Sequence, residues 1–492
     1  MTESQTPPHA GPGPEGVPST PNPRTKGVPS TPSPGNVVSS PSPAIVRLAR
    51  GLIDVFFRTV EVDGAERVPT EGPILVVANH HNSLVDPALL LAQLPRSPRF
   101  LAKSTLWQMP ILKQLLDAGA AIPIYRQQDA SPDGRDPQGT DRAEGNLATF
   151  ARCFEVLAAG GAVALFPEGI SHDAPYLAPL KTGAARIALE AEQAHGPLGI
   201  RIVPVGLTFD DKGTFRSRAL LHVAEPLDLT EERAAHAEDP RETVRALTAR
   251  IDASLRRVTL NYRASEEVRV VDRAAEVLAR PSQELPTRLA LAEAAHLRRT
   301  VMAAYGRLRE IDPVRVESVR RRAERYATQL AKLDVRDDQV AARYPTGQVA
   351  LWAAGSVSLL LFWLPLALIG TVLNGIPYWL CGVAARFSRT DDLPATYKLM
   401  GGLVLFPVYW SVAALLAWSA GGSAWSALGV FVAGPITGWF GVLFHERYDR
   451  FLDEAATWLR LKLPWSRARA LREERAALHA ELRELEDKDP KA

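Results

Sequence analysis

The sequence predicts an α/β domain with a largely parallel sheet, followed by a helical region and C-terminal transmembrane helices. Short apolar runs of strand length alternate with helical segments, which is typical of a parallel sheet covered by helices. A long, charge-rich segment with helical periodicity follows. Two later stretches lack charged residues, and each exceeds the ~20 residues that cross a bilayer as one helix. The strand runs are residues 74–78, 120–125, 162–166 and 200–207, the clearest helices are 143–159 and 182–194, and the uncharged stretches are 344–385 and 399–444.

These segments define the predicted domains. A tail rich in Pro, Ser and Thr is expected to be disordered, because it has too few apolar residues to build a core. An α/β domain, a helical extension, a membrane domain and charged C-terminal helices follow. Their predicted limits are 1–42 for the tail, 43–230 for the α/β domain, 231–343 for the extension, 344–444 for the membrane domain and 445–492 for the last helices.

Composition excludes several classes of protein. The 492 residues leave room for two or three domains, and a hydrophobic content of 46% is sufficient for a core. Because 57 Lys and Arg residues balance 55 Asp and Glu residues, for a net charge of +2, no nucleic-acid partner is expected. Cys153 and Cys381 lie far apart without metal-ligand spacing, so neither a disulfide framework nor a metal site is predicted.

Residues 73–87 combine a buried strand with a candidate acid–base pair. The strand ends in a polar turn, where His81 is followed after four residues by Asp86. On one helix these positions would lie about 140° apart, so the turn must fold back if they are to meet. The Asp86 carboxylate can then accept from one imidazole nitrogen of His81, which leaves the other nitrogen to take a proton from a hydroxyl. Alternatively, Asp86 is the N-cap of a helix that begins at Pro87.

Two other strand runs end at charged residues. Arg126 follows the second run, and Glu168 and Gly169 follow the third in the sequence Phe-Pro-Glu-Gly. Ligands of parallel sheets bind beyond the carboxyl ends of the strands, so a base, a cation and a carboxylate are expected at one edge. A guanidinium suits a phosphate, and Lys181 precedes a helix whose N-terminus offers further donors to an anion. Alternatively, Arg126 is a surface charge and Glu168 belongs to a simple turn.

Four motifs resemble, in the same order, those of the glycerolipid acyltransferases, the His-x4-Asp family. They are residues 79–87, 122–126, 166–169 and 203–205. The resemblance implies that His81 and Asp86 are catalytic and that Arg126 binds the phosphate of the acceptor. It also implies that Glu168 and Gly169 help to hold the acceptor.

The resemblance distinguishes between two adjacent histidines and favours one branch of the family. His81 matches the family histidine, whereas His80 lies six positions before Asp86 and is expected to be a bystander. The longer blocks at 166–173 and 179–183, and the segment at 255–261, look like the eukaryotic-type glycerol-3-phosphate and dihydroxyacetone-phosphate acyltransferases.

The expected function is therefore transfer of a fatty acyl group from acyl-CoA or acyl carrier protein to glycerol 3-phosphate in phospholipid biosynthesis. Acyl-CoA would be a co-substrate, and no cofactor is expected. Two alternatives stay open: the same chemistry on lysophosphatidate or another lysophospholipid, and an inactive membrane scaffold.

The two uncharged stretches are expected to form helical hairpins. Their midpoints, near Pro365 and at Gly421 and Gly422, suit turns and would place all charged flanks on one side of the membrane. The positive-inside bias makes that side cytoplasmic, and the catalytic domain is expected there. Alternatively, the first stretch is one crossing followed by an interfacial segment around Tyr378 and Trp379.

Overall fold

The computed structural model describes residues 40–126, 141–279, 288–342, 344–388, 390, 393–462 and 465–486. Nearly all of the predicted Pro/Ser/Thr-rich tail, residues 1–39, therefore lies outside the described residues.

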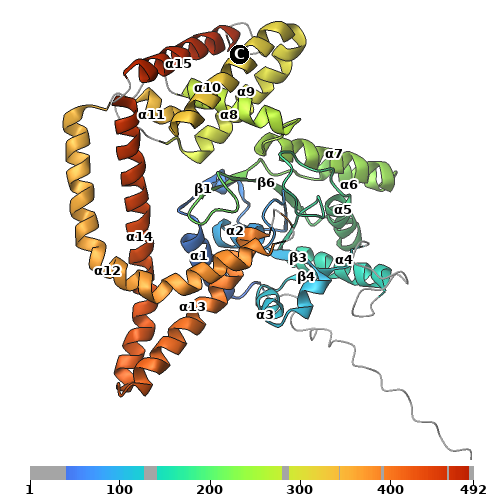
Figure 1. Cartoon of the computed structure of the whole chain (residues 1–492). Coiled ribbons are helices and arrows are strands. Elements are labelled where there is room, and N and C mark those ends of the chain that lie inside the picture. Colours follow the sequence, from blue (N-terminus) through green and yellow to red (C-terminus); the bar gives the residue numbers. More distant parts are fainter. Residues whose placement is uncertain are drawn as a thin grey trace, which may run out of the picture. The chain divides into compact units, whose positions relative to one another are not determined.

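The α/β domain is built on a mixed sheet of seven strands (Figure 1). The strand order is β1-β7-β6-β2-β5-β3-β4, and all neighbours are parallel except β6 and β7. The strands are β1 (Thr59–Asp63), β2 (Ile74–Ala78), β3 (Arg99–Lys103), β4 (Ile122–Ile124), β5 (Ala162–Leu165), β6 (Arg201–Phe209) and β7 (Arg218–Val223). The predicted fold class, a largely parallel α/β sheet followed by helices, is confirmed.

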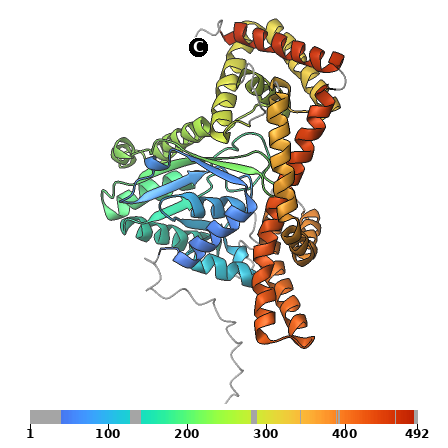
Figure 2. The same ribbon diagram turned by 90° about the vertical axis from the view of Figure 1, so that its left-hand side faces the viewer.

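Helices cover both faces of this sheet, and Figure 2 shows them on either side of the strands. The central strand β2 is buried along its whole length, because its residues alternate between two cores. Ile74, Val76 and Ala78 join the core under α1 and α2, whereas Leu75 and Val77 join the core under α4, α5 and α7. The helices of this domain are α1 (Pro43–Phe56), α2 (Val85–Gln93), α3 (Pro110–Ala118), α4 (Arg142–Ala158), α5 (Gly183–His195), α6 (Thr230–His236) and α7 (Pro240–Val258). The predicted limit at residue 230 is wrong, because α7 packs in the core of the sheet.

The helical region contains a core of its own. The C-terminal helix contributes four leucines to it, beside residues of α8 and α10. Asp337 is buried at this junction and accepts hydrogen bonds from Tyr326 and Arg475. The predicted C-terminal charged helix thus packs within the helical region. The elements are α8 (Ser265–Ala279), α9 (Leu291–Ile311), α10 (Pro313–Leu333), α11 (Asp337–Ala341) and α15 (Trp465–Glu486), and the leucines are Leu471, Leu478, Leu482 and Leu485.

Within the part of the chain that the structure describes, three helices are long and apolar enough to cross a membrane by length and composition. They are α12 (Thr346–Arg386), α13 (Pro394–Ser419) and α14 (Ala424–Lys462). The predicted turn at Gly421 and Gly422 is present between α13 and α14, which lie side by side in Figures 1 and 2.

The other predicted hairpin is wrong. Helix α12 continues through Pro365 and Pro377 as one helix of 41 residues. Proline removes a single N–H donor, and a helix in an apolar setting can continue past it with a local adjustment. Helix α14 also runs on to Lys462, so the predicted boundary at residues 444 and 445 falls inside a helix.

Candidate active site

The predicted site residues follow the carboxyl ends of three strands. β2 and β5 are direct neighbours in the sheet, and β4 lies at the edge beyond β3. His80 and His81 follow β2, Glu168 follows β5, and Arg126 follows β4. Because these strands are parallel, their carboxyl ends meet at one edge of the sheet. The prediction that a histidine, an arginine and a carboxylate lie at one edge of the sheet is confirmed, and the chemical role of each stays a prediction.

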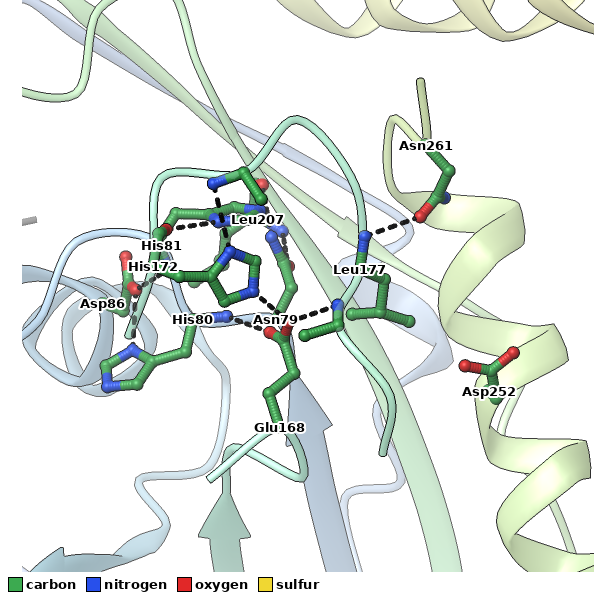
Figure 3. A network of polar contacts seen from close by, with 12 residues as sticks. Asn79, His80, His81, Asp86, Glu168, His172, Leu177, Leu207, Asp252 and Asn261 are labelled. Atoms are coloured by element: carbon green, nitrogen blue, oxygen red, sulfur yellow. Dashed lines mark hydrogen bonds and ion pairs between the residues drawn. The ribbon is translucent and has the colours of Figure 1, made fainter. Parts of the chain in front are cut away.

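The Asp86 carboxylate is the centre of the turn after β2 (Figure 3). It is fully buried, and its Oδ2 accepts from the backbone N–H groups of His81 and Asn82, both at 2.8 Å, and lies 2.9 Å from Nδ1 of His80. The turn folds back, as predicted. Asp86 is not the N-cap of α2, because the helix begins at Val85 and Leu84 is its N-cap residue.

The histidine that pairs with Asp86 is His80. The prediction that this carboxylate orients the ring of His81 is wrong, and so is the description of His80 as a bystander. The physical reason is that the backbone of His81 occupies Oδ2, while its ring turns to the carbonyl of His172, 3.0 Å from Nδ1. The ring of His80 stacks on Phe166, with ring centroids 4.0 Å apart, and this contact holds it beside Asp86.

This pairing fixes the tautomer of His80. Nδ1 donates to the carboxylate, so Nε2 keeps its lone pair and can accept a proton. Figure 3 shows Nε2 directed away from the hydrogen-bond network. A positive charge formed on the ring would be stabilised by the adjacent carboxylate, as in other acid–base pairs of this kind.

His81 has a different environment. Burial lowers the pKa of its imidazole below the ordinary value of 6.5, although the carbonyl of His172 and the carboxylates of Asp86 and Glu168 oppose this effect. A protonated ring is therefore costly at this position. Its Nδ1 is oriented by a neutral carbonyl, which stabilises an imidazolium less than the carboxylate beside His80 does.

We expect the lowered pKa of His81 to make the folded state sensitive to acid. Above about pH 6.5 the ring is neutral in both the folded and the unfolded chain, so its protonation does not lower the unfolding free energy there. As the pH falls below this value, the unfolded chain binds the proton first, so the unfolding free energy decreases. Denaturant unfolding in detergent between pH 7.5 and about pH 5 measures the slope. His81→Gln should flatten it, and an unchanged slope in this variant would show that His81 is not responsible.

Glu168 is buried, and both of its oxygens are used by the protein. Oε1 accepts from the backbone N–H of His80 at 2.8 Å. Oε2 accepts from the backbone N–H of Ala178 at 2.7 Å and from Nε2 of His172 at 2.5 Å. Nε2 of His172 carries the proton, because its Nδ1 accepts from the backbone of Ala174. Glu168 thus joins the turn after β2, which carries His80 and Asp86, to the loop at residues 170–178. Its predicted role in holding the acceptor stays a prediction.

Glu168→Gln should destabilise this domain. A carboxylate can accept from all three donors, whereas the amide of glutamine turns its NH2 group towards at least one of them. A buried donor left without a partner costs about 1–3 kcal/mol, and we expect a loss of unfolding free energy in this range. Denaturant unfolding in detergent measures it, with Glu155→Gln on the exposed face of α4 as the matched control. Equal midpoints for the two variants would contradict this role of Glu168.

Two cationic side chains, those of Arg126 and Lys181, lie next to Gly169, the residue that follows Glu168. Nη1 of Arg126 donates to the carbonyl of Gly169 at 3.2 Å. Gly169 has φ +69°, and a Cβ there would lie 2.6 Å from Nζ of Lys181. The structure therefore brings Arg126, Gly169 and Lys181 together, as an anion-binding role requires. Binding of a phosphate by these residues stays a prediction.

Besides His80, two other residues of this site were not selected from the sequence. His172 lies inside the block at 166–173 that carries the resemblance, so its position in that block was an available signal. Lys212 donates to the carbonyl of His81 at 3.1 Å and forms an ion pair with Asp173. It follows β6 in a short loop, and no pattern in the sequence indicates that it reaches the turn.

Comparison with known proteins finds two family models that match the chain. An acyltransferase family model matches residues 59–208, and a model of the glycerol-3-phosphate acyltransferase 2 C-terminal domain matches residues 273–492. Residues 59–208 are therefore an acyltransferase-type domain. The resemblance to glycerolipid acyltransferases is confirmed, and the two models together fit the eukaryotic-type glycerol-3-phosphate branch.

Relatives of the acyltransferase domain cover much of the chain. An uncharacterised acyltransferase of Schizosaccharomyces pombe is 28% identical and aligns with 74% of this chain and 66% of its own length. Glycerol-3-phosphate O-acyltransferase 2 of Saccharomyces cerevisiae is 26% identical, over 74% of this chain and 63% of its own length. The chain thus spans slightly less than two thirds of these relatives.

A solved structure also resembles the chain. The 1-acyl-sn-glycerophosphate acyltransferase PlsC of Thermotoga maritima aligns with 42% of this chain and 79% of its own, at 21% identity and a TM-score of 0.29.

Proposed function

We propose that this protein transfers a fatty acyl group from acyl-CoA, or from acyl carrier protein, to glycerol 3-phosphate. The observation that carries the proposal is the His80–Asp86 pair, in which Nε2 of His80 can accept a proton. The named activity of the yeast relative supports the choice of acceptor. The cationic group of Arg126 and Lys181, at the same edge of the sheet, supports a phosphorylated acceptor.

In the proposed reaction, His80 acts as the general base. Nε2 takes the proton of an acceptor hydroxyl, and the oxygen attacks the thioester carbonyl. The new C–O bond forms, the C–S bond breaks, and the imidazolium returns the proton to the leaving thiolate. Asp86 keeps the reactive tautomer and stabilises the charged ring. The residues need no cofactor for this step, and acyl-CoA is the proposed co-substrate.

We also propose that the apolar helices anchor the catalytic domain on the cytoplasmic side of a membrane. Lys398 of α13 and Glu446 of α14 both contact the loop between β6 and β7, at 2.7 and 2.5 Å from Gly213 and Arg216 respectively. The hairpin formed by α13 and α14 therefore begins and ends beside the catalytic domain. The cations Lys398, Arg447 and Arg450 at its base support the cytoplasmic side.

An acceptor panel tests the proposal. Purified protein in detergent is assayed with acyl-CoA against glycerol 3-phosphate, dihydroxyacetone phosphate and lysophosphatidate. Faster transfer to glycerol 3-phosphate supports the proposal, and faster transfer to lysophosphatidate favours the alternative acceptor. No transfer to any of the three, with either acyl-CoA or acyl carrier protein, would favour an inactive scaffold.

A further inference from the structure

The N-terminal end of α13 packs into the catalytic domain. Ala395 is fully buried and Leu399 is 6% exposed, and both belong to the core under α1 and α2. A helix that only anchored the protein in a membrane would not need to pack into this core. The N-terminal end of α13 is thus fixed beside the helix that carries Asp86, which is α2.

Thr396 directly contacts the turn between β2 and α2, which is called the catalytic turn below (residues 79–86). Its Oγ1 accepts from the backbone N–H of Leu84 at 3.2 Å. Leu84 is the N-cap residue of α2, where backbone N–H groups lack partners within the helix. The preceding residue, Ser83, has φ +40°, a conformation that an L-residue keeps only when its surroundings hold it. Thr396 helps to hold this conformation through the N–H of the next residue, Leu84. Ser171 holds it directly, because its hydroxyl accepts from the backbone N–H of Ser83.

Lys398 forms a second link, through the loop between β6 and β7. Its Nζ donates to the carbonyl of Gly213 at 2.7 Å. The neighbouring Lys212 donates to the carbonyl of His81, and its own carbonyl accepts from the side chain of Asn82. The loop therefore connects α13 with His81 and Asn82, whose backbone N–H groups donate to the Asp86 carboxylate.

The other apolar helices hold the same loop. The ring of Phe215 packs edge-on against Tyr378 of α12, with centroids 6.0 Å apart. Nε of Arg216 lies 2.5 Å from Oε1 of Glu446 of α14, and its guanidinium lies over the ring of Trp439 at 5.4 Å. All three apolar helices thus contact the loop that supports the catalytic turn.

We propose that Thr396 and Lys398 are positioning residues, through which the apolar helices hold the turn that carries His80 and Asp86. In this arrangement the helices set the geometry of the site as well as anchoring the protein. The inference rests on the proposed acyl transfer, and it assigns to the N-terminal end of α13 a role in the rate of that reaction.

Steady-state kinetics of the full chain in detergent test this inference. Thr396→Val keeps the shape of the side chain but removes the acceptor of the Leu84 N–H. Small misplacements of a catalytic group slow a reaction strongly, and we expect kcat to fall about tenfold, with KM for acyl-CoA and glycerol 3-phosphate changing by less than about twofold. Thr396→Ser keeps the hydroxyl and should restore kcat to within about threefold of wild type.

Matched variants complete the test. Ser411→Ala removes a hydroxyl from an exposed position of the same helix, where it bonds only to Pro407 among the described residues, and should leave kcat unchanged. Lys398→Met removes the second link and should lower kcat, whereas Lys398→Arg keeps a donor and should lower it less. This pair decides the question should the valine variant fail to fold.

Specific results would overturn the inference. They are a wild-type kcat for Thr396→Val, a change confined to KM, or equal losses for the valine and serine variants. Absence of transfer by the wild-type protein would overturn the proposed function, and this inference with it. Wild-type transfer that is lost in His80→Ala but unchanged in Thr396→Val and Lys398→Met would overturn this inference alone.

Discussion

His80→Ala should lower kcat for acyl transfer by about 10²–10⁴-fold, the usual contribution of a positioned general base. The variant removes the nitrogen that takes the acceptor proton and leaves the Asp86 carboxylate with its two backbone donors. The turn should therefore keep its conformation, and KM for glycerol 3-phosphate should change little. Initial rates with acyl-CoA and glycerol 3-phosphate measure the effect.

His81→Ala is the matched control for this variant. It removes an adjacent ring whose Nδ1 bonds to a backbone carbonyl, and we expect less than about a tenfold loss of kcat. A larger loss of kcat in His81→Ala than in His80→Ala would show that His81 is the base, as the sequence motif predicts.

Asp86→Asn should have the second large effect, with kcat reduced about 10³-fold. Oδ2 accepts from three N–H groups, and Oδ1 has no hydrogen-bond partner among the described residues. An amide NH2 placed at Oδ2 would face these donors, and one placed at Oδ1 would be buried without an acceptor. Either placement removes the negative charge that stabilises a protonated His80.

The same variant should also lower the unfolding free energy, by about 1–3 kcal/mol for the unsatisfied polar group. Rates and denaturant unfolding in detergent measure both effects, with Asp54→Asn on the exposed face of α1 as the control. A variant that keeps wild-type activity would show that Asp86 only shapes the turn.

The centre of the fold could be predicted from the sequence because its strands are buried on both faces. β2, β5 and β6 appear as continuous apolar runs, so their burial is visible in composition. β1, β3 and β7 were missed. They carry polar or charged residues at their ends or on one face, and only their pairing with neighbouring strands identifies them.

The site could be predicted to the level of the sheet edge but not to the level of one ring. Residue spacing located Asp86, Arg126 and Glu168, because each follows a strand end. Spacing could not choose between His80 and His81, since their ring directions depend on tertiary contacts. Stacking on Phe166 fixes one ring, and the carbonyl of His172 fixes the other.

The two predicted membrane turns differ in local chemistry. Gly421 adopts φ +93°, a conformation that glycine reaches without strain, and the chain reverses there. Pro365 restricts φ to a value that a helix also uses, so proline alone did not specify a reversal.

The most direct measurement is kcat/KM for glycerol 3-phosphate in the wild type, His80→Gln and His81→Gln. Each glutamine keeps a polar side chain of similar size but has no nitrogen that can take the hydroxyl proton. We predict a loss of about 10²-fold or more in His80→Gln and of less than about tenfold in His81→Gln. A larger loss in His81→Gln than in His80→Gln would contradict the assignment of His80 as the base.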